Sequence, residues 1–179
     1  MEKNKEFLEL LRHYRHDWLN VLQLIKGNMA LNQPQRVEEI IQAAVRRSAN
    51  ESKLSNLQMP KLAFLLITHN WRDYFFHLDY EVSGEIADLS YYDDALYDWC
   101  RHFFQLIHKT SSIGSENSLL VTFQLLPDDF RLIFDYSGHL INEATVDKWL
   151  NNEGKRADKL IIVEKYVTMK EFVVEIKLT

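Results

Sequence analysis

The chain has 179 residues, of which 46% are hydrophobic and 12% aromatic, and its formal net charge at pH 7 is −5. This composition excludes a disordered chain, and an acidic chain without a basic stripe is not typical of proteins that bind nucleic acid or anionic membranes. No apolar run approaches the roughly 20 residues needed to span a bilayer, and the N-terminus lacks the layout of a signal peptide. The single cysteine, Cys100, cannot form an internal disulfide. We therefore expect a soluble, cytoplasmic protein with neither nucleic-acid nor membrane partners.

An amphipathic pattern predicts a first helix over residues 4–31 and a second over residues 35–57, separated by a short break that ends at Pro34. At a rise of 1.5 Å per residue the first helix would be about 40 Å long. The two helices should form an antiparallel hairpin. The apolar side of the first helix includes Phe7, Tyr14, Trp18 and Ile25 and is too broad for one neighbouring helix to cover. Two hairpins from two chains would bury it in a four-helix bundle, so we expect a homodimer. The alternative is that the hairpin packs on the rest of its own chain.

One histidine, His16, lies on the polar side of the first predicted helix. At about 100° per residue, the apolar side chains crowd the opposite face, so this imidazole should point into water while its helix is buried behind it. A histidine imidazole is mostly neutral at pH 7 and is then a good nucleophile. A lone histidine on a helix is usually only a polar surface residue, but here several nearby side chains could contact an attached group or a docked protein. These side chains are Arg12, Arg15, Leu19, Asn20 and Gln23. The arrangement suits a histidine that carries a phosphoryl group and presents it to a partner protein.

From residue 59 the pattern changes and predicts a small domain of mixed helices and strands. Helices are expected over residues 61–76, 95–109 and 143–151, and strands over residues 78–84, 119–126, 130–136, 160–166 and 172–178. Asp93 or Asp94 could cap the second of these helices, and the run from Pro127 to Asp129 predicts a hairpin turn. The expected fold class is α+β, with a helical hairpin over residues 1–58 and a small α/β domain over residues 59–179.

The sequence gives little support to other chemistry. The histidines outside the hairpin lack the paired spacing that a metal site needs, so no metal site is expected. Cys100 has aromatic neighbours and is expected to be a small core residue rather than a nucleophile. The pair Glu38 and Glu39 is expected to be a solvated helix face.

A run in the first predicted helix reads Arg15-His16-Asp17-Trp18 and continues with Asn20, Leu22-Gln23, Ile25 and Lys26-Gly27-Asn28. Further runs lie at residues 51–57, 62–64, 70–71, 80–82, 84–86 and 88–90. Together these residues closely resemble the sporulation initiation phosphotransferase B family of bacilli, and the run around His16 resembles its phosphoacceptor helix. The co-occurrence of the run around His16 with the stretch at residues 51–57 makes the match strong.

The resemblance implies a dimeric four-helix bundle followed by a domain similar to the nucleotide-binding domain of histidine kinases. A kinase would carry an asparagine-rich patch on the helix at residues 95–109 and glycine-rich acidic boxes. Here only Asp135-Tyr136-Ser137-Gly138 and the isolated Gly154 remain. We therefore expect that the chain has no cofactor of its own, and that its second domain supports the bundle or helps to dock a partner.

The function implied is that of a phosphorelay phosphotransferase. His16 would accept a phosphoryl group from the aspartyl phosphate of a single-domain response regulator and pass it to the aspartate of a response-regulator transcription factor that controls sporulation. Mg²⁺ is expected in the acidic pocket of the regulator. Asp17 could orient His16 or a neighbouring helix. Two alternatives stay open, namely an ATP-using or degenerate histidine kinase fragment and a non-catalytic dimeric adaptor for response regulators.

Overall fold

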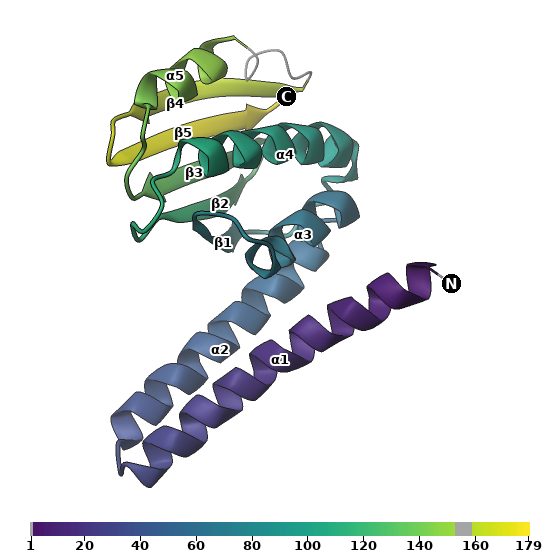
Figure 1. Cartoon of the computed structure of the whole chain (residues 1–179). Helices are drawn as coiled ribbons and strands as arrows, with labels where there is room; N and C mark the ends of the chain where they lie inside the picture. Colours follow the sequence, from purple (N-terminus) through teal and green to yellow (C-terminus); the bar gives the residue numbers. More distant parts are fainter. Residues whose placement is uncertain (1, 153–158) are drawn as a thin grey trace. The chain divides into compact units, whose positions relative to one another are not determined.

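The computed structural model describes residues 2–152 and 159–179, and the chain divides into two units, Met1–Ala49 and Asn50–Thr179. In the first unit, α1 (Glu2–Ala30) runs antiparallel to α2 (Pro34–Ser55), as Figure 1 shows. A tight turn joins the two helices, in which Asn32 adopts φ +54°, a left-handed conformation that asparagine tolerates better than most residues. Pro34 then begins α2, because proline suits the first turn of a helix. The predicted helical hairpin is thus confirmed.

The second unit is an open sheet with helices. Its helices are α3 (Pro60–Ile67), α4 (Asp93–Thr110) and α5 (Glu143–Asn151), with the short 3-10 helices η1 (His69–Trp71) and η2 (Ser90–Tyr92) between them. Its strands are β1 (His77–Gly84), β2 (Ser118–Leu126), β3 (Asp129–Ser137), β4 (Leu160–Val167) and β5 (Glu171–Leu178). The sheet order is β1-β2-β3-β5-β4; β1 is parallel to β2 and the other neighbours are antiparallel. The α+β class is therefore confirmed.

The helices α4 and α5 cover one face of the sheet (Figure 1), and the core lies between these helices and the sheet. Buried side chains recur along α4 at the spacing of one helical face, and they include Trp99, Cys100 and Phe103. Phe103 stacks on Trp149 of α5 at 5.4 Å between ring centroids and meets Phe134 of β3 edge-on at 5.6 Å. Cys100 is fully buried, and burial raises the pKa of its thiol. The prediction of a core cysteine is confirmed.

Side chains form hydrogen bonds to backbone groups on the outer edge of β1. Asn70 of η1 donates its amide to the carbonyl of Leu78, and its amide oxygen accepts from the N–H of the same residue. Four positions along the strand, the amide oxygen of Asn50 accepts from the N–H of Val82, while Lys53 donates to the Val82 carbonyl. The end of α2 that carries Asn50 and Lys53 therefore packs within the second unit.

The predicted helix over residues 61–76 is wrong in its second half, because α3 ends at Ile67. The Thr68 hydroxyl donates to the carbonyl of Phe64 at the end of the helix. Only η1 follows, and Arg72 is extended, with φ −109° and ψ 156°. Contacts with distant parts of the chain override the helical pattern: His69 packs among aromatic rings and Asn70 bonds to the edge of β1.

The predicted cap of α4 is also wrong. Tyr92 occupies the capping position and makes no side-chain capping bond. The carboxylate of Asp93 instead accepts from the backbone N–H groups of Lys61 and Leu62, at 3.1 and 2.9 Å. These are free N–H groups of the first turn of α3, so Asp93 caps a helix other than its own. The predicted hairpin turn between β2 and β3 is confirmed, with Asp128 at φ +58°.

Candidate functional site

His16 lies near the middle of α1, and 70% of its side chain is exposed. The side chains of α1 that are partly buried within the hairpin include Leu10, Val21 and Ile25, which lie on other faces of the helix. The imidazole therefore points into water from a helix that packs through other faces, as the periodicity predicts. Its role as a phosphoryl acceptor stays a prediction at this point.

The ring contacts of His16 gather at one nitrogen. The amide nitrogen of Asn20, one turn along α1, lies 3.3 Å from Nδ1, and a carboxylate oxygen of Asp17 lies 3.7 Å from the same atom. The other oxygen of Asp17 lies 3.5 Å from the guanidinium of Arg47 on α2. As placed, the Asn20 amide nitrogen can only donate to Nδ1, whereas the Asp17 carboxylate favours a proton on that nitrogen, which would leave the lone pair on Nε2. A half-turn of the Asn20 amide would present its oxygen to the same N–H.

The other predicted site residues are all exposed on α1. At about 100° per residue, Arg12, Asn20 and Gln23 lie within about 40° of His16, and Leu19 lies about 60° away. Arg15 lies about 100° away and so belongs to the border of this surface. The structure therefore brings most of the predicted residues together around the imidazole.

Sequence reasoning missed two residues beside this surface. Leu24 is an exposed leucine about 80° from His16, and the helical step could have revealed it. Arg47 comes from the second helix, and its ion pair with Asp17 depends on the register of α2 against α1. That register cannot be read from either helix alone.

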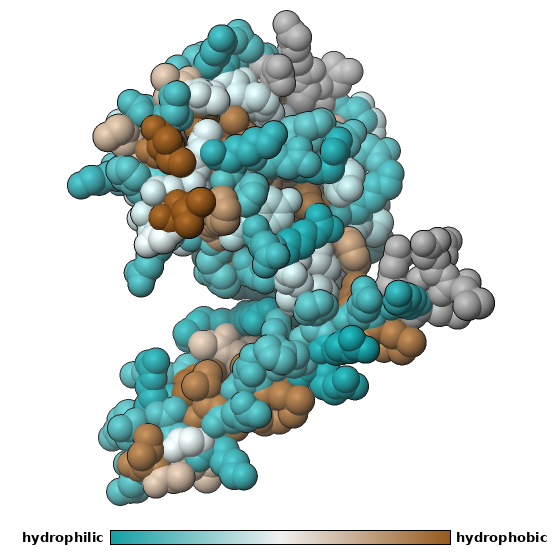
Figure 2. Space-filling view, viewed as in Figure 1, coloured by the Kyte–Doolittle hydropathy of each residue, from teal (hydrophilic) through white to brown (hydrophobic). Residues whose placement is uncertain are grey.

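A second surface of the hairpin is apolar. On α1 a set of exposed apolar side chains recurs at spacings of three, four and seven residues, which place them on one face. This apolar strip consists of Phe7, Leu11, Tyr14, Trp18, Leu22 and Met29, and α2 adds exposed Ile41 and Val45. Figure 2 shows apolar side chains reaching the surface of the hairpin. The strip lies on the side of α1 away from His16, so one helix presents a polar histidine and an uncovered apolar face at the same time.

The run Asp135-Tyr136-Ser137-Gly138 at the end of β3 has a structural explanation. Asp135 is exposed, whereas Tyr136 points into the core, and its hydroxyl bonds to Ser111 and Asn117 at 3.0 and 3.1 Å. Burial raises the pKa of Tyr136. A Cβ added to Gly138 would come within 2.4 Å of the Asn117 side-chain oxygen. Packing around Asn117 therefore explains this glycine without a ligand. Gly154 lies outside the described residues.

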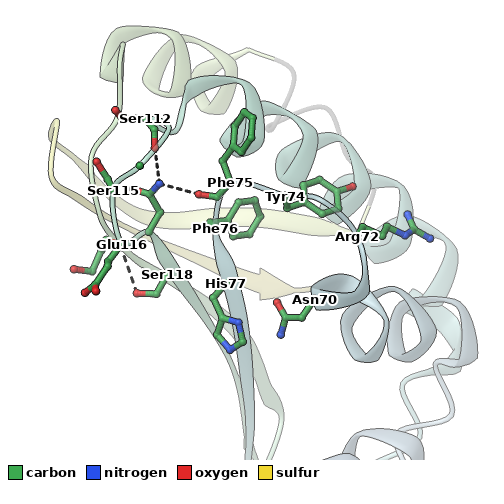
Figure 3. Close-up of a pocket in the computed structure, with 13 residues that line it drawn as sticks. Asn70, Arg72, Tyr74, Phe75, Phe76, His77, Ser112, Ser115, Glu116 and Ser118 are labelled. Atoms are coloured by element: carbon green, nitrogen blue, oxygen red, sulfur yellow. Dashed lines mark hydrogen bonds between the residues drawn. The ribbon is translucent and has the colours of Figure 1, made fainter. Parts of the chain in front are cut away.

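The second unit also contains a pocket of about 710 Å³, lined by segments at residues 70–77 and 112–118 (Figure 3). Asn117 holds the two segments together, because its amide donates to the carbonyls of Phe75 and Ser112. None of the predicted site residues lines this pocket. In the described part of the chain, no cluster of three His, Cys, Asp or Glu side chains could hold a metal ion. Nor is any described helix long and apolar enough to span a membrane.

Comparisons with known proteins cover both units. The family model of the C-terminal part of sporulation initiation phosphotransferase B matches residues 58–179. The model of the alpha-helical domain of SpoOB-type sensor kinases matches residues 1–57. The sporulation initiation phosphotransferase B of Bacillus subtilis (strain 168) is 42% identical over 175 residues, which are 97% of this chain and 90% of that protein.

Among solved structures, the histidine kinase AdeS of Acinetobacter baumannii is similar, with a TM-score of 0.46 and 12% identity over 92% of this chain and 97% of that chain. A blue-light activated histidine kinase of Erythrobacter litoralis gives a TM-score of 0.44 and 11% identity over 95% of this chain and 58% of that chain. The family matches and the 42% identity decide the assignment. The chain belongs to the sporulation initiation phosphotransferase B family.

Proposed function

We propose that this chain is a phosphotransferase of a sporulation phosphorelay. His16 accepts the phosphoryl group of an aspartyl phosphate on one response regulator and passes it to the aspartate of a second. The observation that carries the proposal is an exposed imidazole with a carboxylate 3.7 Å from its Nδ1. Membership of the family and a 42% identical relative that is named a phosphotransferase support it.

In the first transfer, the Nε2 lone pair of His16 forms the N–P bond while the bond from phosphorus to the aspartyl oxygen of the donor breaks. The electron pair of the broken bond stays on the released carboxylate. The ring keeps its Nδ1 proton and gains positive charge, which the Asp17 carboxylate offsets. In the second transfer the N–P bond breaks, its electron pair returns to Nε2, and a carboxylate oxygen of the acceptor takes the phosphorus. The chain thus ends each cycle unchanged.

Phosphoryl transfer depends mainly on alignment and on neutralisation of charge. Mg²⁺ held by the acidic pocket of the regulator would neutralise charge on the phosphoryl oxygens, so the chain needs no cofactor of its own. Its contribution is the surface that aligns the regulator. We assign that surface to Arg12, Arg15, Leu19, Asn20 and Gln23, and we add Leu24. The donor is a single-domain response regulator, the acceptor is a response-regulator transcription factor, and the reaction takes place in the cytoplasm.

We also propose that the chain works as a homodimer whose two hairpins form a four-helix bundle. The support is the apolar strip, which is exposed in the single chain and repeats at the spacing of bundle interfaces. Burial of the strip against its copy would leave His16 on the outside of the bundle. Each protomer would then present its histidine to a regulator.

Leu22→Glu is expected to dissociate this dimer, because a symmetric interface buries the new carboxylates without a partner. We expect the dissociation constant to rise by at least roughly 100-fold, a change of about 2.7 kcal/mol. Sedimentation over a range of protein concentrations measures it. Leu24→Glu is the matched control, since both leucines are 56% exposed on α1 but only Leu22 lies in the apolar strip. Equal dissociation by both variants, or by neither, would contradict the proposed interface.

Two labelled donors offered in parallel test the proposed reaction. A phosphorylated response regulator is expected to label the chain with an acid-labile, base-stable phosphate that a second regulator then removes. ATP with Mg²⁺ is expected to give no label, because the second unit lacks the asparagine-rich and glycine-rich motifs of kinases and packing explains Gly138. Labelling from ATP alone would make the chain a kinase. Binding of a regulator without any label would make it an adaptor.

A further inference from the structure

His69 is a buried titratable residue that the proposed reaction does not use. Its side chain is 1% exposed and stacks on Tyr74 at 4.3 Å between ring centroids. Phe76 lies 4.6 Å away, and Phe104 of α4 meets the ring edge-on at 5.3 Å. Among the described residues, neither ring nitrogen has a hydrogen-bond partner. The site therefore accommodates a neutral imidazole, and the backbone of Phe76 favours a charged ring there only against the larger cost of burial.

The charged neighbours make protonation still less favourable. Arg72 on the same loop, His77 on β1 and His108 on α4 all act on His69, and each is a cation or becomes one on protonation. The loop from η1 to β1 contains one carboxylate, Asp73, which is exposed. Burial is the largest cause and lowers the pKa of His69 to about 4. An unfolded or released histidine takes up its proton near pH 6.5.

The residue after His69 is Asn70, which bonds to both backbone groups of Leu78 on the edge of β1. The same segment lines one side of the pocket in Figure 3, where Tyr74 and Phe76 are drawn with Asn70. His69 thus holds this segment in place through its contacts with neighbouring aromatic rings, and Asn70 connects the segment to the sheet. Release of the ring would take the Asn70 bonds away from the strand.

We propose that His69 is an acid-released latch that fastens the segment from His69 to His77 against α4 and, through Asn70, against the edge of β1. The latch is closed while the imidazole is neutral. Protonation favours the released ring, because burial in the closed site disfavours the charge more than the backbone of Phe76 stabilises it. Stability held by the latch is therefore complete well above pH 6.5 and is lost progressively as the pH falls towards 4.

His69→Phe tests the latch, since phenylalanine keeps the aromatic packing and cannot be protonated. Between pH 7.5 and pH 5 the unfolding equilibrium constant of the second unit is expected to rise at least roughly tenfold more in the wild-type chain than in the variant. His77→Gln removes an exposed histidine from the same segment and should keep most of the wild-type dependence, because burial and not His77 is the largest cause of the lowered pKa of His69. Equal pH dependence in the wild type and His69→Phe would overturn the proposal.

Two measurements on the wild-type chain make the test independent of how the variant folds. The ring resonances of His69 should titrate well below pH 6.5, and a midpoint at or above that value would overturn the latch. Hydrogen exchange of the Leu78 amide, which donates to Asn70, reports the release directly. Its protection should fall at pH 5 more than that of amides in the β2–β3 ladder. Parallel loss at both places would indicate global unfolding and contradict a local latch.

Discussion

His16→Ala is expected to abolish labelling from a phosphorylated response regulator, with a loss of at least about three orders of magnitude in the transfer rate. The variant removes the nitrogen that forms the bond to phosphorus, and alanine leaves no group that can replace it. Because 70% of the side chain is exposed, the free energy of unfolding should change by less than about 0.5 kcal/mol. The measurement is the time course of label on the chain after mixing with the phosphorylated regulator.

His13→Ala is the matched control, because His13 is also exposed and lies one turn before His16 on the same helix. Its variant should take up and return the phosphoryl group with little change. Loss of activity in both variants would point to a general disturbance of the docking surface rather than to a phosphoryl acceptor. Full activity of His16→Ala in a reconstituted relay would reject the phosphotransferase and favour the adaptor.

Asp93→Ala is expected to destabilise the second unit by about 2–3 kcal/mol. The buried carboxylate accepts from two backbone N–H groups at the start of α3, and alanine would leave both without that partner. The negative charge also lies at the positive end of the α3 dipole. Chemical denaturation of the full chain, with the unfolding of the second unit followed separately, measures the loss.

The neighbouring Asp94 provides the comparison. Its carboxylate pairs with the Lys61 side chain at the surface, where solvent screens the interaction. Asp94→Ala removes the same charge from the same turn of α4 and should leave unfolding almost unchanged. Similar losses in the two variants would mean that charge at the start of α4, and not the bonds to α3, is what matters.

The parts of the fold that the sequence predicts are those set by local periodicity. The hairpin, the five strands and the outward direction of His16 follow from patterns of period 3.6 or 2, which single elements carry by themselves. The ion pair of Arg47 with Asp17 and the cap made by Asp93 join residues 30 or more positions apart. No local pattern specifies such pairs. The ion pair is therefore not predicted, and the cap made by Asp93 is predicted for the wrong helix.

Residues 61–76 show the opposite case, in which a local pattern predicts more helix than the structure forms. Leu62, Leu65 and Leu66 supply a helical spacing that the structure uses as far as Ile67. After Ile67, the backbone conformation is set by the burial of His69 among aromatic rings and by the bonds of Asn70 to β1. Since these contacts depend on where α4 and β1 lie, the end of the helix was not predictable from its own composition.

The side-chain bonds along the edge of β1 also affect how the chain can associate with other copies of itself. Exposed strand edges recruit further strands and lead to aggregates. Side chains occupy both backbone groups of Leu78 and of Val82, and the opposite edge strand, β4, is interrupted by a bulge between Ile162 and Glu164. Neither border of the sheet is thus a good template for another chain. In the proposed dimer, self-association would instead use the apolar strip of the hairpin, and a twofold interface of that kind closes at two subunits.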